Sequence, residues 1–216
     1  MKKIFITGAG SGLGKEAAIE LARRGHTVYA TVYYQDQLKP LEEIARSEKI
    51  DLKIFKLDIT KIEDQNLVSN FDIDVFISNA AIGNSGSVID TSIDKIKEVF
   101  DTNVFYNLSI IQCALKNMIK RKQGRIIIIS SLVGRIPLPF LSPYCASKSA
   151  LESFGICLNQ ELKIINKLSN TNITVSLVEP GAYATGFNKE DSNPHFRYYA
   201  PWWQEFLVQI GRIIGM

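Results

Sequence analysis

One short stretch of the chain holds two residues, Tyr144 and Lys148, whose types and spacing suit proton transfer. Residues four apart lie on one face of an α-helix, about one turn from each other. Pro143, just before them, is typical of a first helical turn. A free tyrosine has a pKa of about 10, and a neighbouring ammonium favours the phenolate. We therefore expect Lys148 to lower the pKa of Tyr144, which makes Tyr144 a candidate acid/base. Such pairs also occur on ordinary helix surfaces, so the surrounding elements must decide.

Length and composition indicate one globular domain over residues 1–216. The chain is 46% hydrophobic and 22% charged, which is ordinary for a folded protein. Its net charge of +3 is too small to favour nucleic acid or an anionic membrane as a partner.

Cysteine and hydrophobic patterns exclude two further classes. Cys113, Cys145 and Cys157 have no metal-ligand spacing, so we expect no metal site and a reducing, cytoplasmic location. No run of eighteen apolar residues is present, so no membrane span is expected.

Short apolar, β-branched runs alternate with helical patterns along most of the chain. This alternation predicts βαβ units, and hence an α/β fold with a parallel sheet and helices on both faces. The expected strands are residues 4–6, 27–32, 52–57, 75–77, 125–129 and 173–178. The expected helices are residues 15–24, 38–49, 93–120 and 147–168.

A glycine-rich turn joins the first expected strand to the first helix. Its spacing is Gly8-x-x-x-Gly12-x-Gly14, and the generic G-x-G-x-x-G fingerprint fails because Leu13 stands where its last glycine would be. Such a turn lets backbone amides approach a pyrophosphate at the positive end of a helix. A tight loop alone would explain the glycines less well, since a strand and a helix flank them as a dinucleotide site requires.

The order of these and further motifs resembles the short-chain dehydrogenase/reductase family from the first strand to about Phe187. The resemblance implies a Rossmann-like, doubly wound sheet of about six strands in the order 3-2-1-4-5-6. One departure is Ala81, where the family usually has glycine. The motifs that carry the resemblance are Thr7-Gly8-x-x-x-Gly12-x-Gly14, Leu57-Asp58-Ile59-Thr60, Asn79-Ala80-Ala81, Asn103, Ser131, Tyr144-x-x-x-Lys148, Pro180-Gly181 and Thr185.

This resemblance implies both a cofactor site and a catalytic tetrad. The implied tetrad is Asn103, Ser131, Tyr144 and Lys148. The implied NAD(P) contacts are Thr7, Gly8, Ser11, Gly12, Leu13, Gly14, Tyr33, Asp58, Ile59, Asn79, Ala80, Tyr144, Lys148, Pro180, Gly181 and Thr185.

Hydride transfer to a carbonyl builds negative charge on its oxygen, and Ser131 and Tyr144 are both able to donate to that oxygen. Tyr144 would exchange the proton. The resemblance implies that Lys148 binds the nicotinamide ribose and that Asn103 holds a water linking Lys148 to solvent.

Each of these positions also has a structural explanation. A serine such as Ser131 often caps a turn at a strand end, and Asn103 would serve as a polar contact within a helix. Asp58 would suit the N-cap of a helix that begins near Thr60.

The choice of nucleotide depends on the end of the second strand, Thr31 to Gln35, which carries neither the acid typical of NAD sites nor the base typical of NADP sites. Since no carboxylate there repels a 2′-phosphate, we favour NADP and keep NAD as the alternative. Tyr33 or Tyr34 would stack on the adenine or simply be an aromatic at a strand end.

Apolar residues flank the expected site. The loop 135–141 is rich in proline and apolar residues, and six aromatic residues follow Thr185: Phe187, Phe196, Tyr198, Tyr199, Trp202 and Trp203. If they form a lid over residues 181–216, the substrate is a small, mostly apolar carbonyl or alcohol. The loop and the segment Tyr144-Cys145-Ala146-Ser147-Lys148 resemble the steroid- and retinol-dehydrogenase branch of the family. Lid packing without selectivity is an equally good explanation.

The end of the chain departs from the family pattern. Residues 203–216 read as a short amphipathic helix, with no further strand after it, so we expect the family's C-terminal strand to be missing. Pairing through that strand is then in doubt, and a homodimer through the long helices 93–120 and 147–168 is expected instead.

Together these patterns predict an NAD(P)-dependent oxidoreductase that interconverts a hydroxyl and a carbonyl group. The alternative is a protein of the same fold that binds NAD(P) as a sensor or scaffold without catalysis. A serine hydrolase using Ser131 is excluded because no histidine and acid are suitably placed.

Overall fold

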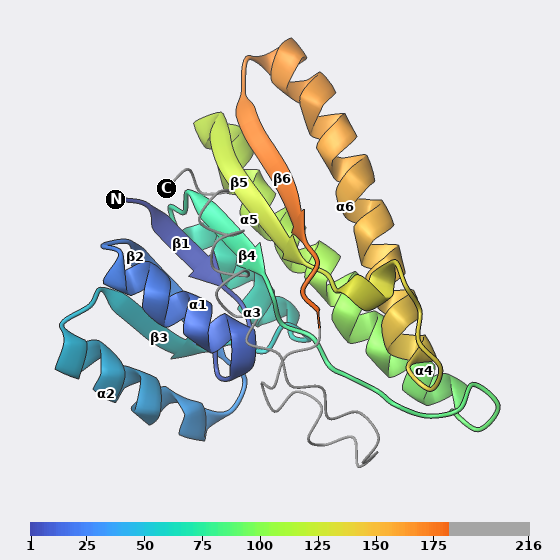
Figure 1. The fold of residues 1–216 in the computed structure, drawn as a ribbon. Coiled ribbons are helices and arrows are strands. Elements are labelled where there is room, and N and C mark those ends of the chain that lie inside the picture. The colour runs from blue at the N-terminus through green and yellow to red at the C-terminus, as the bar shows by residue number, and fades with distance from the viewer. Residues whose placement is uncertain (182–216) are drawn as a thin grey trace.

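The computed structural model describes residues 1–181. Within them the chain forms one parallel sheet with helices on both of its faces (Figure 1). The expected lid and its aromatic residues, Thr185, the terminal helix and the question of a further strand all lie outside the described residues.

The sheet has six strands in the order β3-β2-β1-β4-β5-β6, and every pairing is parallel. Both the strand order and the doubly wound arrangement predicted from the sequence are confirmed. The strand bounds differ from the expected ones by no more than two residues. They are β1 Lys3–Ile6, β2 Thr27–Val32, β3 Leu52–Lys56, β4 Val75–Ser78, β5 Gln123–Ile129 and β6 Asn172–Val178.

Helices cover the sheet from two sides. In Figure 1, α1 and α2 lie over β1 to β3, and α6 runs along β6. Of the helices in residues 1–181, none is both long and apolar enough to cross a membrane. The α-helices are α1 Gly12–Arg23, α2 Leu38–Glu48, α3 Ile62–Leu67, α4 Ile93–Phe100, α5 Asn107–Arg121 and α6 Ser142–Ser169. Short helical turns are η1 Gln35–Gln37, η2 Val68–Asn70, η3 Asp101–Tyr106 and η4 Leu132–Gly134.

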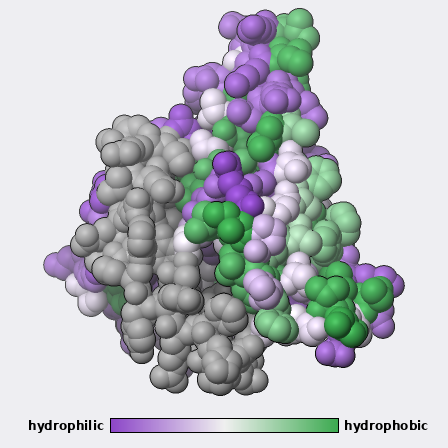
Figure 2. Space-filling model, turned by 45° about the vertical axis from the view of Figure 1, so that its right-hand side comes forward, coloured by the Kyte–Doolittle hydropathy of each residue, from purple (hydrophilic) through white to green (hydrophobic). Residues whose placement is uncertain are grey.

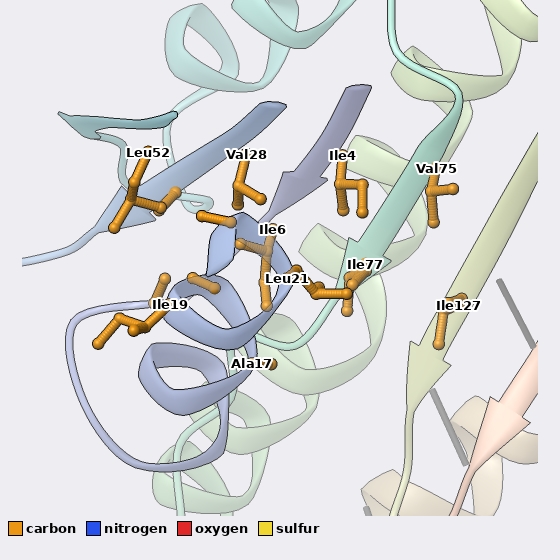
Figure 3. Packing of buried hydrophobic residues seen from close by; sticks show 14 of the residues in the cluster. Ile4, Ile6, Ala17, Ile19, Leu21, Val28, Leu52, Val75, Ile77 and Ile127 are labelled. Carbon is orange, nitrogen blue, oxygen red and sulfur yellow. The ribbon is translucent and has the colours of Figure 1, made fainter. Parts of the chain in front are cut away.

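Alternate residues of β1 supply two separate cores, because successive side chains of a strand point to opposite faces. Ile4 and Ile6 pack with Ile19 and Leu21 of α1 (Figure 3). Phe5, between them, packs on the other face in a second cluster with Phe76. Fully burying an aliphatic or Phe side chain contributes about 1.5–3 kcal/mol. From Ile4 to Ile6 the central strand is apolar at every position, which suits a strand covered by helices on both faces.

The helix predicted over residues 93–120 is interrupted. The structure has α4, then the π-helical turn η3, and then α5. Asn103 lies in η3 with a fully buried side chain that bonds outside its own helix. We attribute the wider turn to these hydrogen bonds of Asn103. Such π-bulges are frequent at functional sites.

The helix predicted over residues 147–168 starts earlier, at Ser142, and ends at Ser169. Pro143 lies in its first turn, as the sequence predicts. Tyr144 therefore belongs to this helix one turn before Lys148.

Ile4→Ala should lower the free energy of unfolding by about 2–5 kcal/mol, because it leaves a cavity beneath the central strand. Urea denaturation measures this change. As a control, Ile89→Ala should cost less than about 0.5 kcal/mol, since Ile89 is 92% exposed. Equal losses in the two variants would contradict the described core.

Candidate active site

The candidate catalytic residues gather where strands end. All six strands are parallel, so their carboxyl ends meet at one edge of the sheet, where α/β proteins bind ligands. Ser131 follows the end of β5, and Tyr144 lies in the first turn of α6. The structure thus places both residues at the edge that the sequence predicts.

A side-chain hydrogen bond joins Ser131 to Tyr144. The hydroxyl of Ser131 also accepts from the backbone N–H of Val133, at 3.4 Å, and lies 3.4 Å from the carbonyl oxygen of Pro180. Ser131 therefore caps the turn η4, as its structural explanation proposed, and also contacts the candidate acid/base. The two roles coexist.

Lys148 is buried, with 3% of its surface exposed. Its Nζ donates to the carbonyl oxygen of Ile129 at 2.9 Å and lies 5.6 Å from the centroid of the Tyr144 ring. Burial lowers the pKa of Lys148 to about 8, and the carboxylate of Glu152 opposes this shift. Near neutral pH the amine keeps most of its positive charge, although burial disfavours it.

The expected lowering of the pKa of Tyr144 is not found in this structure. Burial raises the pKa of Tyr144 to about 12, and the hydrogen bond from Ser131 opposes the rise only in part. Desolvation disfavours the phenolate more than its neighbours favour it. Lys148 Nζ donates to Ile129, and its contact with Tyr144 is to the ring. At neutral pH Tyr144 therefore holds its proton, which is the state that donates to a carbonyl oxygen.

Asn103 is fully buried and joins two segments of the site. Its side chain accepts from Ile82 N at 2.8 Å, donates to Ile82 O at 2.9 Å, and donates to Ser147 Oγ at 3.0 Å. Ser147 Oγ in turn donates to Tyr144 O at 2.8 Å. The expected polar contact is present and fixes the start of α6 against the segment after β4. The water link to Lys148 stays a prediction.

The glycine turn has a backbone conformation and packing that require glycine at several positions. Gly8 and Gly12 have φ of 68° and 56°, a conformation that favours glycine. A Cβ on Gly8 would lie 2.8 Å from Ala80 Cα, and one on Gly14 would overlap the Gly8 carbonyl. Ser11 is the exposed N-cap of α1, where backbone N–H groups and the helix dipole favour an anion. With Leu13 in the first turn of α1, these residues fit a dinucleotide pyrophosphate.

Thr7 and Asn79 brace this turn against the end of β4. Thr7 Oγ1 accepts from the backbone N–H groups of Asn79 at 3.0 Å and of Ala80 at 3.1 Å. Asn79 Nδ2 donates to the carbonyl oxygens of Thr7 at 2.9 Å and of Gly8 at 3.0 Å. The motifs after β1 and β4 therefore form one bonded unit, and their direct contact with a cofactor stays a prediction.

Asp58 closes a local turn and is not a helix cap. Its Oδ1 accepts from Thr60 N at 2.9 Å and from Thr60 Oγ1 at 2.8 Å. The following helix, α3, begins at Ile62 after the N-cap Lys61, so the capping explanation is wrong. Asp58 and Ile59 are both buried next to the end of β3, and their contact with an adenine stays a prediction.

Tyr33 follows the end of β2 and is 52% exposed, with its ring edge-on to that of Tyr34 at 4.8 Å between centroids.

Sequence reasoning missed Gln37, which lies near Tyr33 and Tyr34. Gln37 Oε1 accepts from Tyr34 N at 3.0 Å, and the Gln37 amide lies where a Cβ on Gly10 would project. Gln37 thus borders the glycine turn, and its position after the second strand was the available signal.

The last segment of the predicted site is described only at its start. Pro180 O accepts from Leu132 N at 2.9 Å, which joins the end of β6 to η4, and Gly181 is exposed. Across residues 1–181, no group of three or more His, Cys, Asp or Glu side chains is placed to hold a metal ion.

Comparison with known proteins decides the family. Residues 2–195 match the profile of the short chain dehydrogenase family. This chain belongs to that family. Dehydrogenase/reductase SDR family member 7B of Xenopus tropicalis is 32% identical over 197 residues, which cover 86% of this chain and 62% of that protein. Estradiol 17-beta-dehydrogenase 1 of Rattus norvegicus is 34% identical over 197 residues, which cover 87% of this chain and 56% of that protein.

Solved structures share the fold of this short-chain dehydrogenase. A short-chain dehydrogenase of Sphingobium yanoikuyae in complex with NADPH has a TM-score of 0.82 and 22% identity, and the match covers 99% of this chain and 85% of that one. One of Burkholderia phymatum in complex with NAD has a TM-score of 0.80 and 21% identity, covering 98% and 78%. The chain spans about three fifths of the length of the curated relatives named above.

Lys148→Met should change how stability depends on pH. The pKa of Lys148 falls from its ordinary 10.5 to about 8 on folding. Between these two values the unfolded chain binds more protons, so stability from this group is fully present above pH 10.5 and is lost as pH falls through about 8. The free energy of unfolding of the wild type, relative to Lys148→Met, should therefore rise as pH increases from 7 to 10. Urea denaturation at several pH values measures it, and a flat difference would contradict the buried ammonium.

Proposed function

We propose that this short-chain dehydrogenase is an NAD(P)-dependent oxidoreductase that interconverts a hydroxyl and a carbonyl on a small, mostly apolar substrate. The observation that carries the proposal is the hydrogen bond between Ser131 and Tyr144, one helical turn from the buried amine of Lys148. These three groups lie at the sheet edge that also holds the glycine turn.

The chain's own residues would bind the cofactor and handle the proton. The backbone of the glycine turn would hold the pyrophosphate, and Lys148 would hold the nicotinamide ribose. The bound nicotinamide supplies or accepts the hydride. During reduction, Ser131 and Tyr144 would donate to the carbonyl oxygen, and Tyr144 would give up its proton. The positive charge of Lys148 would then stabilise the tyrosinate, and oxidation would run the same steps backwards.

The loop between η4 and α6 supports an apolar substrate. Its side chains Ile136 and Phe140 are exposed by 59% and 54%. Phe140 has a φ of 63°, which is strained for a bulky residue, and its carbonyl accepts from Gly86 N at 2.8 Å. A loop that exposes apolar groups beside the site favours an apolar ligand. A steroid-like or retinoid-like alcohol is the class we propose.

Two further features bear on partners and compartment. Hydrophobic side chains reach the surface among hydrophilic ones on the face that includes α6 (Figure 2). Phe154, Ile156 and Ile164 of α6 are exposed, and this supports a homodimer through the long helices.

The three cysteines are unpaired, which suits a reducing cytoplasm.

Tyr144→Phe should lower turnover about 100-fold to 10,000-fold, because the ring stays but the transferable proton is lost. The assay would follow NADPH and NADH oxidation with a panel of aliphatic ketones, aryl aldehydes and steroid ketones. Cofactor binding, measured by fluorescence titration, should change less than about threefold.

The matched control is Tyr29→Phe, which removes a hydroxyl from β2 within the aromatic cluster and should leave turnover unchanged. Retained activity in Tyr144→Phe would contradict the proposed acid/base. A wild type that binds cofactor but reduces no member of the panel would favour the sensor or scaffold alternative.

Tyr33→Asp should shift the cofactor preference toward NAD at least about tenfold, because a carboxylate after β2 repels a 2′-phosphate. Titration with NADP and with NAD gives the ratio of dissociation constants. Tyr33→Asn removes the same ring without adding charge and serves as the control. An unchanged ratio in Tyr33→Asp would contradict the placement of Tyr33 at the cofactor's adenosine end.

A further inference from the structure

A buried carboxylate lies one helical turn beyond the candidate catalytic pair. Glu152 on α6 is 7% exposed, and residues four apart on a helix have Cβ atoms about 5–6 Å apart, so Glu152 neighbours Lys148. Buried carboxylates are rare unless they are paired or hydrogen-bonded. Sequence reasoning about the tetrad did not include Glu152, so its burial requires an explanation.

Two side chains from the segment after β5 hold this carboxylate. Ser130 Oγ donates to Glu152 Oε1 at 2.8 Å, and Arg135 Nε lies 3.5 Å from Glu152 Oε2. Ser130 Oγ also lies 3.4 Å from the backbone oxygen of Lys148. The segment after β5, which also includes Ser131, thus orients the carboxylate of Glu152 on α6.

Arg135 extends the connection to a third segment. Its Nη2 forms an ion pair with Glu179 Oε1 at 2.6 Å, just beyond the end of β6. Glu152, Arg135 and Glu179 therefore join α6, the turn η4 and the end of β6. These are the segments that position Lys148, Ser131 and the Pro180 carbonyl.

We propose that Glu152 is a positioning residue for the proposed reaction: its carboxylate, oriented by Ser130 and Arg135 one helical turn from Lys148, holds Lys148 in its ammonium form. This inference rests on the proposed function of the site. A charged residue then stands at position 152, where an apolar one would otherwise pack, because burying the lone ammonium of Lys148 is costly unless an opposite charge compensates it.

The charges around Lys148 support one direction of effect. Burial lowers the pKa of Lys148, and Glu152 is the charge that raises it. Tyr144 faces the amine as a neutral phenol at neutral pH. Arg135 faces Glu152 from the turn after β5 and also pairs with Glu179, and the positive charge of Arg135 partly offsets the field of Glu152. Removing Glu152 should therefore favour the neutral amine, and removing Arg135 should favour the ammonium.

The test compares Glu152→Gln with Glu179→Gln, each made with and without Lys148→Met. Glutamine keeps an oxygen acceptor for Ser130 and removes only the charge. The part of the pH-dependent stability that belongs to Lys148 changes between its folded pKa and its ordinary pKa, so the lower end of this pH range should lie near pH 8 in the wild type. In Glu152→Gln we expect this lower end to move down by about one pH unit. In the control Glu179→Gln it should stay in place, although the same Arg135 loses a partner.

A second variant keeps the test decisive if Glu152→Gln does not fold. Arg135→Gln changes a half-exposed residue and should move the lower end of this pH range upward, opposite in sign to Glu152→Gln. An unmoved lower end in Glu152→Gln, or equal shifts in Glu152→Gln and Glu179→Gln, would overturn the proposal.

Activity provides a separate readout. With NADPH and the panel carbonyl that the wild type reduces fastest, the alkaline limb of kcat should move to lower pH in Glu152→Gln. Activity at pH 8.5 should fall about tenfold, against less than about threefold at pH 6. A uniform loss at every pH would indicate a merely structural role and overturn the proposal. If no carbonyl is reduced, the proposed function fails, while the stability measurement still decides whether Glu152 acts on Lys148.

Discussion

The chemistry proposed for this protein depends on an amine held where water is largely excluded. Lys148 is fixed at the junction of α6 and β5 by its bond to the carbonyl oxygen of Ile129. Burial makes its charge costly, and the same burial raises the pKa of Tyr144 to about 12. Both side chains thus take their properties from one environment, in which desolvation outweighs the opposing effects of Ser131 on Tyr144 and of Glu152 on Lys148. The phenol stays protonated, and the ammonium needs support from a carboxylate.

That environment exists because the sheet is covered on both faces. Ile127 and Ile129 of β5 enter one core, and Ile126 and Ile128 enter the other. A strand buried in this way leaves its carboxyl end as the place where polar side chains collect. The glycine turn after β1 and the candidate catalytic segment after β5 are on the same edge for this topological reason. The site is therefore a consequence of parallel strand order more than of local sequence.

Irregular backbone then adjusts the site. The π-helical turn η3 places Asn103 so that its side chain bonds both Ile82 and Ser147. Through Ser147, the segment after β4 is tied to the backbone of Tyr144. In a regular α-helix over the same residues, Asn103 would point away from Ile82 and Ser147. The added residue of a π-helical turn rotates the side chains before it relative to those after it. Short-chain dehydrogenases share the fold, and in this chain these hydrogen bonds hold the segments of the candidate site together.

The sequence alone determined the six strands, most of the helices and the glycine turn, because buried parallel strands and glycine turns have local signatures in period and residue type. The strand order followed from the resemblance to the family. The tertiary structure alone decided the pKa direction of Tyr144, the interrupted helix at Asn103 and the buried position of Glu152. Desolvation and long-range hydrogen bonds produce these features, and both depend on which segments meet in space. Spacing along a helix brought Lys148 beside Tyr144, but only packing decided how much water surrounds them.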